Sequence, residues 1–526
     1  MKEKEFNLLS EPWIRVIKGD CRVEEVSLAD ALINAHEYKD LAGELPTQNA
    51  AILRLLLAVL HAVFERVDIE GDDRPLESPD DALDRWSELW ENRRFPQRPL
   101  ETYFESQREN FWLFHPERPF WQINEIKEGE KTQSEPVKKI NGAISESNNK
   151  IRIFAERTQG AKDSLSNAEA ARWLVYLNQY DDNTLKTGVG VAFLGQIASL
   201  IAKGSNLFET LMLNFVLLDQ SKEVWDLGQE SWAKDFDTGG KVITVAFPHS
   251  LIEVLSYHSR NGKLNVENGK LLRYVSTKGG YAFETINRNE QMSLWRHNEK
   301  DDTFSVVRSM YGCQFWRELP FMFNGDYGYS LLSHWHSVLQ HYHYLDNSMA
   351  IIYEVIGVLY DKAQHSSVED VYYDSVSIHL GLISDLGKQY QIHISDEIQK
   401  CHSIATLLGN LSYDLFIAAG GDKEKKGHAE SNVYEEFFYN IDVPFRKWLF
   451  SLNPKDGDID NKVLQWRHES EVIALSMAEK MVKEAGPAAF KGKFISISKD
   501  NNKKRFYSSS TAMNTFRINM SKLKGV

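Results

Sequence analysis

The chain has 526 residues, of which 42% are apolar and 26% are charged, and its net charge is −14 at neutral pH. This length predicts two or more domains, and the negative charge argues against a protein that binds nucleic acid over its whole surface but leaves room for a local basic patch. Short apolar runs, a charged first segment with no signal-peptide core, and three scattered cysteines predict a cytoplasmic protein without a disulfide framework or a cysteine-only zinc site.

The first predicted element is a β-hairpin over residues 6–16. An apolar run at 6–9 and a second at 13–16 are separated by a segment that contains Pro12. Proline has no backbone N–H, so a central strand cannot run through it unbroken. We expect two short strands joined by a turn, with Trp13 packed in the core.

Helices and loops are expected over the next two hundred residues. Residues 111–122 contain two prolines and predict an aromatic-rich buried loop, whereas the polar residues 127–162 predict a long exposed loop. The irregular segment 181–204 carries four glycines, and a capped helix is expected over 205–214.

The second half changes from strands to helices. Alternating residues between 240 and 310 predict antiparallel hairpins, and residues 376–394 predict one more around 384–387. Beyond residue 394, four apolar stripes at helical spacing predict a four-helix bundle, from which the basic segment 491–507 extends. The predicted fold class is α+β, with a mixed α/β domain over 1–392 and a helical bundle over 393–526.

No catalytic motif stands out in the chain, and we expect no cofactor. A group of four histidines, interleaved with aromatic residues, is the best metal candidate; on a strand, side chains two residues apart would point the same way. Its members are His334, His336, His341 and His343. One alternative function is therefore a metal-dependent hydrolase at this cluster, and the other reading of the same residues is histidines with satisfied hydrogen bonds in an aromatic layer.

Four segments are candidates for nucleic-acid contact. Glycines in 181–190 allow a backbone to approach a partner closely. Lys278 precedes two glycines and could extend from a loop, the tip 384–389 could wedge into a duplex, and the loop 127–150 holds several lysines. Each segment also has an ordinary interpretation, as a turn, a surface lysine or a solvated insert.

Three motifs occur in an order that resembles one known family. They are NLLxxxWIxV at residues 7–16, FxLF followed by PFxQ within 111–122, and NLFETLxLN at 206–214. With the terminal bundle, they resemble CasA, the large subunit of the type I-E CRISPR Cascade complex. The resemblance implies a non-enzymatic subunit that recognises the protospacer-adjacent motif (PAM) in duplex DNA, helps start strand separation and R-loop formation, and recruits a helicase-nuclease. Its implied partners are crRNA, the other Cascade subunits, double-stranded target DNA and that helicase-nuclease. Besides the metal-dependent hydrolase, the second alternative function is a purely structural scaffold subunit.

The resemblance also implies which residues touch nucleic acid. The family reads the PAM from the minor groove with a glycine loop, a lysine finger and a glutamine-bearing wedge hairpin. Placed by order along the chain, these parts correspond to Asn183, Thr184, Lys186, Gly188, Gly190, Lys278, Asp385, Gly387, Lys388 and Gln389. A loop that docks onto crRNA or neighbouring subunits corresponds to Lys138, Lys139, Asn141 and Lys150.

Overall fold

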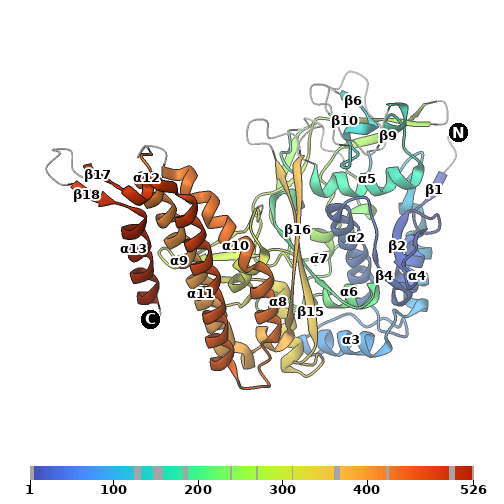
Figure 1. The fold of residues 1–526 in the computed structure, drawn as a ribbon. Coiled ribbons are helices and arrows are strands. Elements are labelled where there is room, and N and C mark those ends of the chain that lie inside the picture. The colour runs from blue at the N-terminus through green and yellow to red at the C-terminus, as the bar shows by residue number, and fades with distance from the viewer. Residues whose placement is uncertain are drawn as a thin grey trace. The chain divides into compact units, whose positions relative to one another are not determined.

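The computed structural model describes residues 5–123, 132–144, 146, 157, 159–181, 188–236, 240–267, 270–310, 312–360, 368–421, 426–496 and 504–523. The chain divides into two compact units that both appear in Figure 1. The first comprises Met1–Phe315, Phe321–Leu345 and Ile351–Val376, and the second comprises Trp316–Pro320, Asp346–Ala350 and Ser377–Val526. Helices and strands are mixed in the first unit and helices dominate the second, which confirms the predicted α+β class.

The first unit is built from several small sheets around buried helices. Its helices are α1 (Leu28–Ile33), α2 (Pro46–Phe64), α3 (Pro79–Asn92), α4 (Gln97–Gln107), α5 (Asn167–Tyr180), α6 (Leu207–Leu213), α7 (Leu251–Leu255) and α8 (Leu331–His341). Its strands are β1 (Glu5–Asn7), β2 (Ile14–Lys18), β3 (Val23–Val26), β4 (Tyr38–Leu41), β5 (Trp112–Phe114), β6 (Thr132–Pro136), β7 (Ser199–Lys203), β8 (Val242–Val245), β9 (Gly262–Glu267), β10 (Lys270–Thr277), β11 (Gly280–Phe283), β12 (Trp295–Asn298), β13 (Thr303–Val306) and β14 (Gly328–Tyr329). The long strands β15 (Ala350–Tyr360) and β16 (Val368–His379) pair with each other and with β7 in the order β16-β15-β7.

Helix α2 is the central core helix of this unit. Pro46 occupies its first turn, where a missing N–H costs nothing, and almost every later side chain is buried against α5, α7 and their neighbours. By length and composition α2 could cross a membrane, but 94% of the relevant window is buried inside the protein, as in the core helix of a soluble protein.

The N-terminal segment turns as expected, but it does not form a hairpin. β1 pairs with β5, whereas β2 pairs with β3 and β4, so the predicted hairpin over 6–16 is wrong. The backbone N–H of Glu11 donates to the Asn7 carbonyl at 2.8 Å, and this turn before Pro12 sends the two strands into different sheets. Trp13 is fully buried and its Nε1–H donates to the Leu8 carbonyl at 2.9 Å, which confirms its packing role.

The strands between residues 240 and 310 follow the prediction only in part. β9 and β10 are antiparallel, as are β12 and β13. In contrast, β8 and β11 are parallel, and parallel strands need a long connection in place of a tight turn. The pair β9 and β10 lies between β8 and β11 in the sequence and provides that connection.

The second unit is a helical bundle with a small hairpin. Its elements are α9 (Lys388–Ala418), α10 (Lys426–Ser451), α11 (Ile459–Glu484), α12 (Gly486–Lys491), β17 (Lys493–Ser496), β18 (Lys504–Tyr507) and α13 (Ser509–Leu523). α9 packs against α10, α11 and α13, with aromatic rings such as Phe445 and Trp466 in contact between α10 and α11. The predicted C-terminal helical region is therefore present.

The start of this unit differs from the prediction. β16 ends at His379 and two short 3-10 turns follow, η8 (Leu380–Ile383) and η9 (Asp385–Gly387), so the hairpin expected over 376–394 is wrong. Tyr390, Ile394 and Ile398 recur every four residues and bury one face of α9, because this spacing is helical. The expected domain boundary between 392 and 393 consequently falls inside α9, whereas the long continuous segment of the second unit begins at Ser377.

Candidate nucleic-acid interface

The predicted glycine loop is held in place by one buried arginine. Arg260 is fully buried; its Nε–H donates to the side chain of Asp181, and its Nη2 donates to the Asp181 carbonyl at 3.0 Å and to the Gly190 carbonyl at 2.6 Å. The N–H of Ala192 also donates to the Asp181 carbonyl, at 2.8 Å. Arg260 therefore fastens together the two ends of segment 181–190.

Two of the predicted loop residues have glycine-type backbone angles. The φ angles of Gly188 and Gly190 are +88° and +82°, in the left-handed region that favours glycine. Asn183, Thr184 and Lys186 lie outside the described residues. The backbone at Gly188 and Gly190 thus has a conformation that suits glycine, and the contact of this loop with nucleic acid stays a prediction.

The lysine finger lies on the turn between β10 and β11. Lys278 is exposed and is followed by Gly279 and Gly280, with φ angles of +96° and +140°. A Cβ atom on Gly280 would lie 2.5 Å from the Ser259 carbonyl oxygen and 2.8 Å from Cγ2 of Val189. Because this distance is too short for a side chain, glycine lets the lysine turn pack directly on the glycine loop.

A shared neighbour gives a second measure of how close the two segments are. Gly280 pairs with Val242 across the parallel strands β11 and β8. Cγ2 of Val242 lies 3.7 Å from the position that a Cβ on Gly188 would occupy. The structure therefore brings together the glycine loop and the lysine turn, although they are far apart in the sequence.

An exposed lysine and a cavity lie beside these two segments. Within the part of the chain that the structure describes, Lys278 has no ion-pair partner, so its ammonium group is available to a phosphate. A cavity of about 380 Å³ opens beside the loop. Its lining includes the apolar Val189, the aromatic rings of Phe193, Tyr281 and Phe283, and the oppositely charged Arg308 and Glu284.

The third predicted part has a different structure from the one expected. Asp385, Gly387, Lys388 and Gln389 lie in η9 and the first turn of α9, where Lys388 Nζ is 2.8 Å from Asp385 Oδ1. A Cβ on Gly387 would lie 2.5 Å from two backbone oxygens, so this is a tight turn into a helix. These residues do not form the tip of a hairpin.

The long hairpin of the first unit is β15–β16. Its strands are hydrogen-bonded neighbours joined by only seven residues, 361–367, which lie outside the described residues; such a short connection requires antiparallel strands. The sequence signal for β15 was its nearly continuous run of apolar and β-branched residues, AIIYEVIGVLY.

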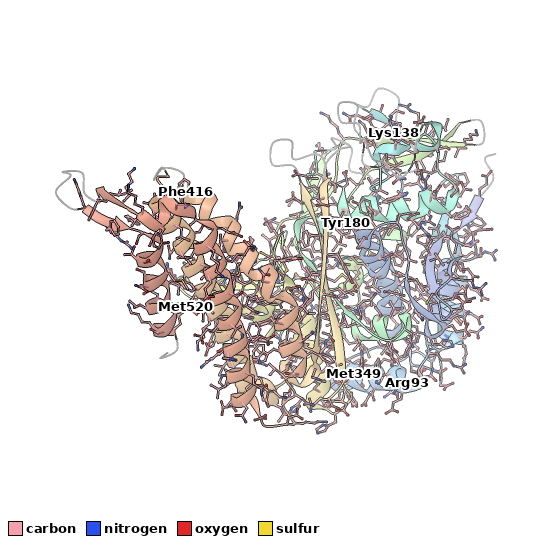
Figure 2. All side chains as sticks on the ribbon, in the orientation of Figure 1. Arg93, Lys138, Tyr180, Met349, Phe416 and Met520 are labelled. Carbon is pink, nitrogen blue, oxygen red and sulfur yellow. The ribbon has the colours of Figure 1, made fainter. Side chains whose placement is uncertain are left out.

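The predicted docking loop is partly built into the fold. Lys139 Nζ is 2.8 Å from Glu135, and Asn141 is buried. Lys138 is half-buried and lies near one edge of the unit (Figure 2). Buried apolar residues at 137, 140 and 144 and the pairing of β6 with β10 explain why residues 132–144 are not the exposed loop that was expected. Lys150 lies outside the described residues.

The histidine cluster lies on a helix and not on a strand. α8 carries His334, His336 and His341, and the described residues contain no group of three or more His, Cys, Asp or Glu side chains that could hold a metal. His336 Nε2–H donates to the Leu213 carbonyl at 2.7 Å, and Nδ1 accepts from the Tyr353 hydroxyl at 2.5 Å. Burial lowers the pKa of His336 to about 4, so this imidazole is a neutral core group at pH 7.

Sequence reasoning did not identify Arg260 or Asp181. Neither residue belongs to a recognisable motif, and 79 positions separate them. No local pattern could have shown that a guanidinium at 260 binds both ends of a loop that begins at 181.

Comparisons with known proteins agree with the sequence resemblance. The model of the family CRISPR-associated protein Cse1 matches residues 7–477. A CasA/Cse1 protein of Thermus thermophilus is 26% identical over 453 residues, which cover 82% of each chain. The structure of Thermobifida fusca Cse1 matches with a TM-score of 0.78 at 24% identity and covers 98% of both chains. The structure of Acidimicrobium ferrooxidans Cse1 matches with a TM-score of 0.75 at 20% identity and covers 100% of this chain and 99% of that chain. A chain of a CRISPR RNA-guided surveillance complex has a TM-score of 0.73 at 15% identity, with 98% of this chain and 100% of that chain covered. The chain belongs to the Cse1 (CasA) family of CRISPR-associated proteins.

Proposed function

We propose that this protein is the non-catalytic large subunit of a cytoplasmic, RNA-guided complex that detects foreign DNA. Its partners are crRNA, the other Cascade subunits and double-stranded target DNA. Family membership supports this role, as does the fold shared with a chain of an RNA-guided surveillance complex. In such complexes base pairing with the guide reads most of the target, and the protein reads a short adjacent motif.

PAM recognition is assigned to the glycine loop and the lysine turn. The observation that carries this proposal is that Gly188–Gly190 and Lys278–Gly280 are packed against each other, and that Arg260 binds the Gly190 carbonyl of the first segment. A backbone without side chains can approach base edges in the narrow minor groove, and a lysine beside it can position the duplex through a phosphate. Because the minor groove distinguishes bases poorly, we expect several PAM sequences to be accepted.

Strand separation is assigned to the β15–β16 hairpin. The family resemblance implies a glutamine-bearing wedge hairpin, and the segment 384–389 is not a hairpin. The connection between β15 and β16 includes Gln364 in the sequence, so Gln364 replaces Lys388 and Gln389 as the proposed wedge residue. Once the strands separate, the complex recruits a helicase-nuclease that cuts the target.

The test is binding of duplex DNA by the reconstituted complex with and without this subunit. We expect the subunit to raise affinity and R-loop formation on targets with a PAM and to have little effect on targets without one. Gln364→Ala should slow R-loop formation, whereas the control Lys388→Ala with Gln389→Ala should not. Equal binding and equal R-loop formation with and without the subunit would refute the proposal.

Both alternative functions make contrary predictions. A purely structural scaffold would support assembly of the complex without any dependence on the PAM. A metal-dependent hydrolase at His334–His343 would require stoichiometric bound metal, which elemental analysis of the purified protein measures. The neutral, hydrogen-bonded His336 does not favour that alternative.

A further inference from the structure

A small hairpin in the second unit lies beyond the family match. Strands β17 and β18 are antiparallel, with Phe494 opposite Phe506 and Ser496 opposite Lys504. The family model ends at residue 477, so this hairpin is not part of the matched region. It stands beside α12, at one end of the helices of its own unit (Figure 1).

The two faces of the hairpin have opposite character. Ile495 and Tyr507 point toward the bundle and pack with a buried cluster at the end of α9 that includes Ile417 and Ala418; Phe416, labelled in Figure 2, packs against the same cluster. Successive strand residues point to opposite faces, so Phe494 and Phe506 point away from this cluster. The inner face therefore anchors the hairpin, and the outer face is presented to solvent.

The outer face carries a pair of exposed aromatic rings. The ring centroids of Phe494 and Phe506 are 4.9 Å apart, and the two side chains are 67% and 38% exposed. Phe490 on α12, 76% exposed, precedes the hairpin directly. A Cβ on Gly492 would lie 2.7 Å from the Phe506 ring, so glycine at 492 leaves room for that ring in its present position. Large exposed apolar groups that gather in one place mark an interaction site.

Exposed positive charge lies on both faces of the hairpin in an otherwise acidic protein. Lys504 shares the outer face with the two rings, whereas Lys493 and Arg505 lie on the face of Ile495 and Tyr507. Lys491, Lys493, Lys504 and Arg505 are all exposed, whereas the whole chain carries −14. Arg505 is held over the Tyr507 ring at 4.8 Å and lies 3.2 Å from Asp414. For the three lysines, the described part of the chain contains no ion-pair partner. The charge of the hairpin is thus complementary to a polyanion.

We propose that this aromatic and basic hairpin binds an unpaired DNA strand. Exposed rings stack on bases and cations bind phosphates in proteins that bind single strands without sequence preference. A duplex fits less well, because its bases are already stacked and would not reach the rings. Identification of the strand as DNA rests on the proposed function, in which separation of the target duplex releases a single strand.

Binding of a fluorescent oligothymidylate to the full-length protein tests the proposal directly, because it needs neither a PAM nor the assembled complex. Log Kd should rise with log salt concentration, with a slope of about 0.7 for each phosphate contact that the lysines make. Phe494→Leu with Phe506→Leu keeps apolar side chains but removes both rings, and should weaken binding at least about tenfold. Lys504→Glu should weaken binding and reduce the slope by about 0.7.

Matched controls separate the hairpin from general surface effects. Tyr439 is a highly exposed aromatic residue on α10, and Lys447 is an exposed lysine on the same helix. Tyr439→Ala and Lys447→Glu should leave oligothymidylate binding unchanged, and thermal unfolding should show that all variants remain folded.

Several results would overturn the inference. Two of them are unchanged oligothymidylate binding by the double leucine variant and equally weakened binding by the control variants. A third is tighter binding of oligouridylate than of oligothymidylate. A fourth is that the hairpin variants lose binding to phosphatidylserine vesicles but keep binding to oligothymidylate. PAM-dependent duplex binding by the reconstituted complex is measured separately. If the complex shows no PAM dependence while the protein still binds oligothymidylate through the hairpin, the proposed function is refuted and the binding of single strands by the hairpin is not.

Discussion

Replacing Arg260 with methionine tests whether the glycine loop must be held rigid for PAM recognition. Methionine retains much of the apolar volume but removes the guanidinium that binds the Asp181 side chain, the Asp181 carbonyl and the Gly190 carbonyl. The matched second variant combines Arg260→Met with Asp181→Asn, so that the acidic charge is removed together with its partner.

The two variants should differ in stability by an amount that the contacts predict. Breaking one side of a buried ion pair typically costs about 3–5 kcal/mol, because a charge stays behind in a poorly solvated site. The double variant removes that charge and should regain much of this loss. It still deprives the Gly190 carbonyl oxygen of the Arg260 donor, at about 1–3 kcal/mol if this acceptor finds no other donor, whereas the Asp181 carbonyl keeps the Ala192 N–H.

Hydrogen exchange and PAM discrimination distinguish a local effect from general unfolding. The Ala192 amide donates to the Asp181 carbonyl beside the fastened ends, so its exchange should accelerate about tenfold or more in both variants. Discrimination between PAM and PAM-less duplexes by the reconstituted complex should also fall in both, even though thermal unfolding shows the double variant to be the more stable one. A double variant with slow Ala192 exchange and full discrimination would refute the reasoning.

Three further predictions follow from single residues. Lys278→Ala should weaken duplex binding on all PAM sequences and reduce the salt slope by about 0.9. The control is Lys270→Ala, at an exposed lysine at the other end of β10. Gly280→Ala should lower the melting temperature clearly more than Gly19→Ala, because it places a Cβ 2.5 Å from a backbone oxygen at a φ of +140°, whereas Gly19 has open space. Burial lowers the pKa of His336 from 6.5 to about 4, so between these pH values the unfolded chain binds a proton that the folded chain does not. The free energy of unfolding should therefore fall as the pH drops from 6.5 to 4. His336→Gln should make that decline shallower by about 1.4 kcal/mol per pH unit, as measured by denaturant titrations.

Local patterns predicted much of the fold. Asn206 caps α6 by accepting from the Glu209 N–H at 2.8 Å, as the capped-helix motif at 205–214 indicated. Apolar stripes at helical spacing predicted the helices of the second unit, and the family motifs led to the correct family. These successes share a cause, because caps and periodicity act over a few residues and are visible in the sequence.

Pairing between distant segments was not predictable in the same way. The strands near Phe6 and Trp13 were expected to pair with each other because they are adjacent, yet β1 pairs with β5 and β2 with β3 and β4. Around Leu386, alternation suggested a hairpin although the four-residue spacing of Tyr390, Ile394 and Ile398 was already helical. Short apolar runs are ambiguous between strand and helix, and tertiary pairing decides between them.

In the candidate site, too, the sequence indicated each loop by itself but not the contact between the loops. The glycines at 188, 190, 279 and 280 indicated loops that could approach a partner, but each loop alone is an ordinary turn. The two loops lie together because Gly280 has no Cβ, which would lie 2.8 Å from Val189 Cγ2, and Arg260 binds both ends of the first loop. A flexible glycine loop would lose much of its binding energy to ordering, whereas a fastened loop has already lost that freedom on folding. A glycine loop that binds DNA as proposed would therefore need a residue such as Arg260, because glycines do not restrict their own backbone conformation.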